Sequence, residues 1–112
     1  LKINFLEIIM MKYTDEQIKE IILTEYYQRS KGISTNPETH MYNFPELKQI
    51  SNQDIFQNAK YLIDANLVRG GIDEEEEHSF PWITRLTLTG IKFVEEKYQI
   101  KNNKQSSSTN FK

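Results

Sequence analysis

Few residues in this chain are suited to catalysis or to metal binding. His78 follows Asp73 and four successive glutamates, and one imidazole beside flexible carboxylates could hold a metal ion only weakly. No second histidine is near it in the sequence, and the chain contains no cysteine. His40 stands alone in a turn-rich stretch, where we expect it at the surface. Because no nucleophile motif and no glycine-rich phosphate loop occurs, we expect neither an enzyme nor a protein with a metal or cofactor.

Side chains suited to reading a nucleic acid occur together on one expected helix, at about 52–66. Its apolar residues recur at helical spacing and share one face, and the opposite face is polar. Glutamine can pair with adenine edges, and lysine can meet guanine or phosphate. The candidate contacts to double-stranded DNA are therefore Asn52, Gln53, Gln57, Lys60 and Tyr61, together with Arg85 from a later strand.

The charge around that helix leaves a second interpretation open. Residues 46–69 carry Lys48, Lys60 and Arg69 against Glu46, Asp54 and Asp64, so their net charge is zero. That balance is poor for neutralising phosphates, and an ordinary solvated helix face is the alternative. The whole chain has a net charge of -2, so any nucleic-acid binding must come from a local patch.

Start, stop and periodicity signals predict the elements that would position these residues. Thr14 and Gln17 have capping-box spacing and open a helix at 14–30, which Gly32 ends. Pro45 begins a short helix before the one at 52–66. Alternation over 82–88, with Trp82, Thr84, Leu86 and Leu88 on one side of the strand and Ile83, Arg85 and Thr87 on the other, predicts a hairpin with 67–72 and a polar tip near 73–80. A last helix is expected at 88–100, which makes the fold class α+β.

The aromatic residues have two possible roles. Tyr26, Phe44, Phe56 and Trp82 could stack on the bases of a single strand. A domain of this size needs large apolar side chains in its core, so we expect them to pack in the core and the hairpin instead.

Two segments carry a resemblance to a known superfamily. Residues 59–68, Ala-Lys-Tyr-Leu-Ile-Asp-Ala-Asn-Leu-Val, and residues 85–90, Arg-Leu-Thr-Leu-Thr-Gly, followed by Phe93-Val94-Glu95, resemble the winged helix-turn-helix proteins. The resemblance covers about residues 13–100 and extends to small bacterial and phage winged-helix proteins such as the YjcQ-like family. It implies a three-helix core, a hairpin wing and a C-terminal helix that Thr87 caps and Gly90 lets pack closely.

The same resemblance implies a function and an exception to it. Most members bind duplex DNA through the second helix of the turn, which predicts a small transcriptional regulator of a mobile element or phage. Some members bind proteins or RNA instead. The expected wing tip, Asp73 to Glu77, is acidic and would be repelled by phosphate. A winged-helix module that binds a protein through its acidic wing is therefore the alternative function.

The terminal segments and the last helix carry three further expectations. Residues 1–12 form an N-terminal extension, or a short element that covers an apolar face, and residues 101–112 form a disordered polar tail. The longest apolar stretch, 3–11, is too short to span a membrane, so we expect a cytoplasmic protein with no membrane partner. Phe93, Lys97 and Ile100 lie on a second side of the last helix and predict a homodimer there, unless residues 3–11 fold back over them.

Overall fold

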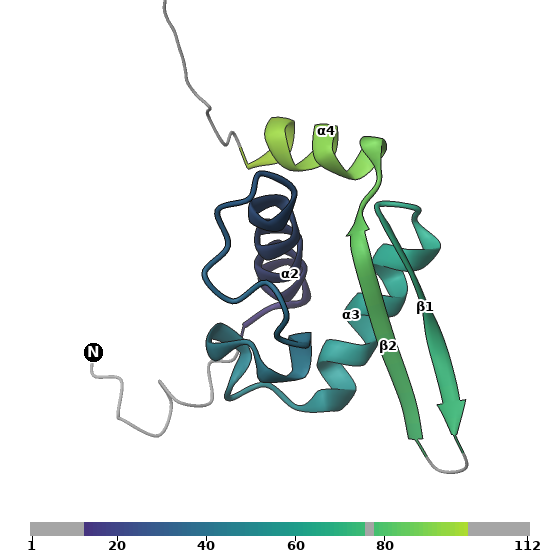
Figure 1. Cartoon of the computed structure of the whole chain (residues 1–112). Coiled ribbons are helices and arrows are strands. Elements are labelled where there is room, and N and C mark those ends of the chain that lie inside the picture. The colour runs from purple at the N-terminus through teal and green to yellow at the C-terminus, as the bar shows by residue number, and fades with distance from the viewer. Residues whose placement is uncertain (1–12, 76–77, 99–112) are drawn as a thin grey trace, which may run out of the picture.

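The computed structural model describes residues 13–75 and 78–98 and has an α+β fold. The helices are α2 (Asp15–Ser30), α3 (Asn52–Asp64) and α4 (Leu88–Lys97), with two short 3-10 helices, η1 (Met41–Asn43) and η2 (Pro45–Leu47). The strands β1 (Val68–Glu75) and β2 (His78–Leu86) form a two-stranded antiparallel sheet. Figure 1 shows α4 crossing above one end of α2, and the hairpin pointing away from α4. The expectations for 1–12, for Ile100 and for 101–112 lie outside the described residues.

Helix α2 begins as its capping signature predicts. The Thr14 side chain accepts a hydrogen bond from the Gln17 N–H at 3.1 Å, and the Gln17 side chain accepts one from the Thr14 N–H at 2.7 Å. These two bonds satisfy amide groups that the first helical turn leaves without partners. At the other end Gly32 has a φ of +75°, a left-handed conformation that glycine adopts without steric cost.

The segment between α2 and α3 differs from its prediction in two respects. Two 3-10 turns replace the single expected helix, and they bury Met41, Phe44 and Leu47 in the core. His40 is half-buried, so its assignment to the surface is wrong. Its Nδ1 accepts a hydrogen bond from the Tyr42 N–H at 3.0 Å and caps η1, while its ring stacks on Phe80 with centroids 4.3 Å apart.

The predicted hairpin is confirmed, but its strands extend to Glu75 and resume at His78, so the expected tip near 73–80 is too wide. The predicted faces of the second strand are also wrong. Val68 pairs with Leu86 and Arg69 with Arg85, and then Gly70 pairs with Ile83. Thr84 is therefore an extra residue, a β-bulge that breaks the alternation. As a result Ile83 and Leu86 are both buried, whereas Trp82 is 40% exposed and does not belong to the core.

The N-terminus of α4 packs directly on the turn between α3 and β1. Thr87 accepts a hydrogen bond from the Gly90 N–H at 2.9 Å and donates one to the Asn66 carbonyl at 2.8 Å. A Cβ atom at Gly90 would overlap the Leu67 carbonyl oxygen. The capping and close-packing roles expected of Thr87 and Gly90 are both present in this chain.

One apolar core joins the three helices to the hairpin. Its fully buried side chains come from α2, η1, η2, α3, β2 and α4, and β1 and β2 cover it with one face. The largest of them are Ile18, Ile22, Leu23, Met41, Leu47, Ile55, Leu62, Pro81 and Val94.

Candidate nucleic-acid interface

Helix α3 presents the five expected contact residues to solvent. Asn52, Gln53, Gln57, Lys60 and Tyr61 are all exposed. Positions 53, 57, 60 and 64 follow one another at three- and four-residue steps, so they form a single stripe on the side away from the core. We call Gln53, Gln57, Lys60 and Asp64 the outer stripe of α3.

The outer stripe carries no excess of positive charge. The Lys60 ammonium lies 2.8 Å from an Asp64 carboxylate oxygen, one helical turn away. Beside the stripe, the Lys19 ammonium of α2 lies 4.5 Å from the centre of the Tyr61 ring. A phosphate approaching Lys60 would have to compete with Asp64, although both side chains are solvated and their attraction is weak.

A buried asparagine that no sequence signal identified fixes the orientation of α3. Asn58 is 3% exposed, and its amide donates to an Asp15 carboxylate oxygen at 3.1 Å and to the Asp54 carbonyl at 2.9 Å. Its neighbours on the helix, Ile55 and Ala59, are fully buried. Asn58 therefore ties α3 to the beginning of α2 and turns the outer stripe toward solvent.

Arg85 lies apart from the outer stripe, beside a second arginine that the DNA-binding prediction omitted. It is directly opposite Arg69 in the sheet register, and both side chains are exposed. Neither guanidinium makes a hydrogen bond or ion pair with any part of the chain that the structure describes. Arg69 and Arg85 line an open groove with Asn66 and Leu88, next to the C-terminal end of α3.

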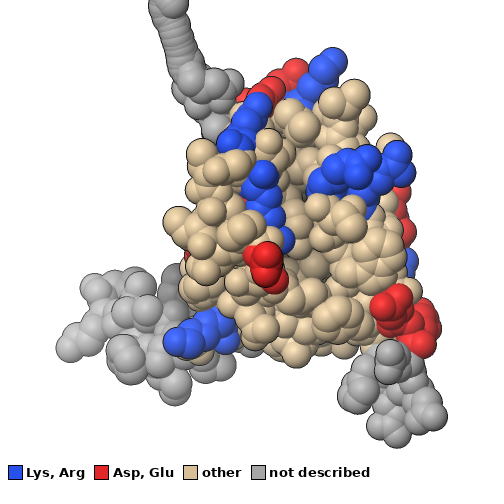
Figure 2. Space-filling view, viewed as in Figure 1, with Lys and Arg blue, Asp and Glu red and all other residues tan. Residues whose placement is uncertain are grey.

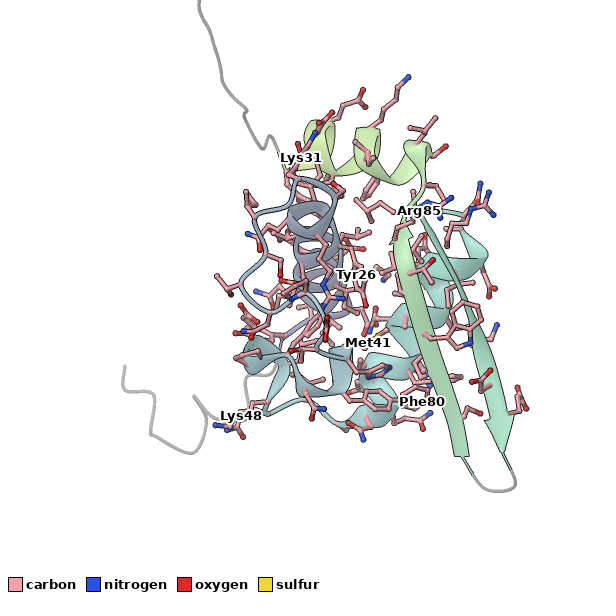
Figure 3. All side chains as sticks on the ribbon, viewed as in Figure 1. Tyr26, Lys31, Met41, Lys48, Phe80 and Arg85 are labelled. Carbon is pink, nitrogen blue, oxygen red and sulfur yellow. The ribbon has the colours of Figure 1, made fainter. Side chains whose placement is uncertain are left out.

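We call Arg69 and Arg85 the arginine pair. Figure 3 labels Arg85 where β2 approaches α4, and Figure 2 shows blue side chains gathered in the same region. Like charges directly opposite one another destabilise a strand pair, so an anion between them would relieve a repulsion that the fold otherwise retains. The register of the hairpin was the signal that could have identified Arg69, but the bulge at Thr84 hides that register in the sequence.

The far end of the hairpin has the opposite charge. Asp73 and Glu74 are exposed, and the Trp82 indole N–H donates to an Asp73 carboxylate oxygen at 3.2 Å. Residues 76 and 77 lie outside the described residues. The hairpin is therefore basic where it joins the body of the protein and acidic toward its tip.

Helix α4 does not leave Phe93 uncovered. Phe93 is half-buried against the core, and its ring meets Tyr98 edge-on with centroids 6.1 Å apart. The exposed Lys97 ammonium lies 5.9 Å from the centre of the Phe93 ring. The chain itself thus covers part of Phe93, the homodimer through Phe93, Lys97 and Ile100 stays a prediction, and the most exposed large apolar residue of α4 is Leu88, at 81%.

Two tyrosines that join α4 to α2 have strongly raised pKa values. The Tyr27 hydroxyl donates to a Glu95 carboxylate oxygen at 2.8 Å, and burial, reinforced by Glu95, raises the pKa of Tyr27 to about 12. Burial, with the negative charges of Glu20 and Glu16, raises the pKa of Tyr98 to about 12. The Tyr27 hydroxyl joins α2 to α4, and neither tyrosine lies on the outer stripe.

Two other kinds of site are missing from the part of the chain that the structure describes. Within residues 13–75 and 78–98, no three side chains of His, Cys, Asp or Glu converge as metal ligands. Over the same residues, no helix has the length and apolar character needed to cross a membrane. Comparison with protein-family models, with curated proteins and with solved structures gave no match.

Proposed function

We propose that this chain is a winged-helix protein that binds double-stranded DNA, with α3 as its recognition helix. The observation that carries the proposal is the outer stripe: a polar, solvent-facing helix side that follows a short helix and precedes a hairpin. Gln53 and Gln57 each offer a donor and an acceptor to base edges in the major groove. A role as a small transcriptional regulator, including one from a phage or mobile element, follows from the winged-helix resemblance.

The arginine pair supplies the charge that the outer stripe lacks. Arg69 lines a groove with Ile63 and Asn66 at the end of α3, so it adjoins the recognition helix. Two guanidinium groups without acidic partners suit a phosphate of the DNA backbone. In this arrangement α3 reads bases and the arginine pair contributes affinity that does not depend on sequence.

Binding of a labelled random-sequence duplex, followed by fluorescence anisotropy, tests the proposal. We expect binding that weakens steeply as salt rises, because phosphate contacts release counterions. Lys60→Glu should abolish binding, and Gln57→Ala should relax sequence preference without changing the salt dependence. Arg85→Ala should weaken binding to all sequences and reduce the slope of log K against log salt by about 0.9.

Lys48→Ala is the matched control for Arg85→Ala. Lys48 is exposed, and Figure 3 places it far from Arg85, beyond η2. Lys48→Ala should leave the affinity unchanged, and it should change the slope of log K against log salt by much less than about 0.9. Absence of duplex binding at low salt would refute the proposal.

The acidic end of the hairpin supports a second candidate, a winged-helix module that binds a protein. Asp73 and Glu74 would repel phosphate, and the Lys60–Asp64 pair leaves α3 without net positive charge. A basic protein surface would complement that end of the hairpin. Loss of a protein partner on converting Glu74 to Gln, with no duplex binding by the unmodified chain, would favour this candidate.

A further inference from the structure

Strand β1 has one edge that no other strand covers. The sheet has two strands in the order β1–β2, so within residues 13–75 and 78–98 the outer edge of β1 has no strand partner. Figure 1 shows β1 on the outer side of the hairpin, with the last turn of α3 beside its first residues. An uncovered edge is a template for another strand, and two-stranded sheets are small compared with the usual four to six strands.

The charges along β1 would attract those of a second β1 strand that runs antiparallel to it. Arg69, Gly71 and Asp73 alternate with their neighbours and therefore share one face of the strand. In a second copy running antiparallel about a two-fold axis at Gly71, each Arg69 lies directly opposite the partner's Asp73. Directly opposite residues share a face, so opposite charges there attract.

Both charged groups are available for such a contact. Arg69 is exposed, and its guanidinium has no partner within the described chain. Asp73 is also exposed, and within the described residues its carboxylate accepts only the Trp82 indole N–H, at 3.2 Å. A carboxylate can accept several hydrogen bonds, so Asp73 retains the capacity to bind a guanidinium.

The shape of the edge fits the same register. Gly70 has no side chain and lines a hollow of about 320 Å³ together with Ile63, Trp82 and Thr84. Pairing about Gly71 places Ile72 of the partner subunit opposite Gly70. A Cβ at Gly70 would overlap the Trp82 carbonyl oxygen, so this position carries no side chain and the partner's Ile72 meets none opposite it.

We propose that two copies of this chain form a two-fold dimer by antiparallel pairing of their β1 edges about Gly71. The product is a four-stranded sheet held by two symmetric Arg69–Asp73 ion pairs between subunits. This interface differs from α4. It engages the Arg69 guanidinium, so in the dimer Arg85 keeps the free guanidinium of the arginine pair.

Sedimentation equilibrium of the full chain, with charge reversal and charge exchange, tests the proposal. The unmodified chain should be a dimer at about 100 μM. Arg69→Asp alone, or Asp73→Arg alone, should raise the dissociation constant about tenfold or more, because each replaces two attractions with two repulsions. The double variant with both substitutions exchanges the charges and should bring the dissociation constant back to within about threefold of the original.

Lys48→Asp is the matched control, because it makes the same charge change at an exposed position beyond η2, away from the hairpin. It should leave the dissociation constant unchanged, and circular dichroism should show every variant folded. Trp82 is the single tryptophan of the chain and lies over Gly71 near the two-fold axis, so its emission should change on dilution along the same curve as the mass. A monomeric chain, failure of the exchanged pair to restore the dimer, or equal weakening by Lys48→Asp would each overturn the proposal.

Discussion

His40 connects two segments that lie far apart in the sequence. The Nε2 atom of His40 lies 2.7 Å from the Pro81 carbonyl oxygen, while its Nδ1 accepts the Tyr42 N–H. These two contacts place the proton of a neutral ring on Nε2, which donates to the strand. A lone histidine in a loop gives no sign of such a role, because its partners, Phe80 and Pro81, are some forty residues away.

Because folding raises the pKa of Tyr27, the free energy of unfolding depends on pH in the alkaline range. Between its ordinary value of 10.0 and the folded value of about 12, the folded state keeps a proton that the unfolded state has lost. The contribution is therefore complete below about pH 10, and the free energy of unfolding should fall as pH rises from 10 to 12. Tyr27→Phe should lower stability at neutral pH by about 1 kcal/mol, through loss of the bond to Glu95, and should make the alkaline decline less steep.

Thermal unfolding followed by circular dichroism at several pH values measures both effects. Glu95→Gln is the informative comparison, because it removes the charge and leaves a hydrogen-bond acceptor. Burial is the larger cause of the shift, so this variant should lower the pKa of Tyr27 only partly. An alkaline decline identical in Tyr27→Phe and the unmodified chain would contradict the assignment.

At the scale of elements, the junction between the hairpin and α4 depends on the missing side chain of Gly90. The Thr87 N–H donates to the Leu67 carbonyl at 3.1 Å, and a Cβ at Gly90 would overlap the same carbonyl oxygen. Because the blocking atom is backbone, it cannot move aside without breaking that bond. Gly90→Ala should therefore lower the free energy of unfolding by about 3 kcal/mol, despite the better helix propensity of alanine.

Gly32→Ala is a useful comparison for Gly90→Ala in urea unfolding. Gly32 has open space around its Cβ position, and only its positive φ opposes a side chain. That substitution should cost about 1 kcal/mol. An equal or smaller loss in Gly90→Ala would show that α4 can shift away from Leu67.

Local signals in the sequence predicted most elements and missed the features that depend on register. The capping box at Thr14, the apolar face of α3 and the pairing of 67–72 with 82–87 are each encoded within a few residues. Helix α3 ends at Asp64 rather than 66 because Asn66 takes a left-handed conformation, with φ of 63°. The bulge at Thr84 moves Trp82 to the exposed face, an outcome that strand alternation alone cannot reveal.

On the helix all five candidate contacts were named from the sequence, whereas on the hairpin Arg85 was named and its neighbour Arg69 was missed. The five α3 residues follow from helical periodicity, which the structure confirms by their exposure. The Lys60–Asp64 pair follows from i,i+4 spacing on a helix, whereas the pairing of Arg69 with Arg85 depends on the register of the hairpin. The basic part of the site was therefore the less predictable part, although it decides how well phosphate is bound.

At the scale of the whole molecule, a small net charge conceals a strong separation of charge. The chain has 14 basic and 16 acidic residues. Within the hairpin, the arginine pair lies at one end, and Asp73 and Glu74 lie toward the other. Figure 2 shows this separation as blue near α4 and red toward the tip of the hairpin. A polyanion such as DNA would be attracted to one end of the hairpin and repelled by the other.

Converting the four glutamates at 74–77 to glutamine tests which end governs binding. The change adds four units of positive charge and spares Asp73, so the proposed dimer contact is retained. If DNA approaches the hairpin, nonspecific affinity at low salt should rise about tenfold, because long-range repulsion is removed. The gain should shrink as salt screens the charges.

A control variant separates this result from a general effect of net charge. Converting Glu38 and Glu96 to glutamine adds two units of positive charge at exposed positions outside the hairpin and α3. Per charge added, those substitutions should raise affinity much less, because repulsion from solvated charges more than about 10 Å away is screened at moderate salt. Equal gains per charge from the two variants would show that DNA does not approach the hairpin, and α3 would then have to bind with the acidic strand ends turned away from the duplex.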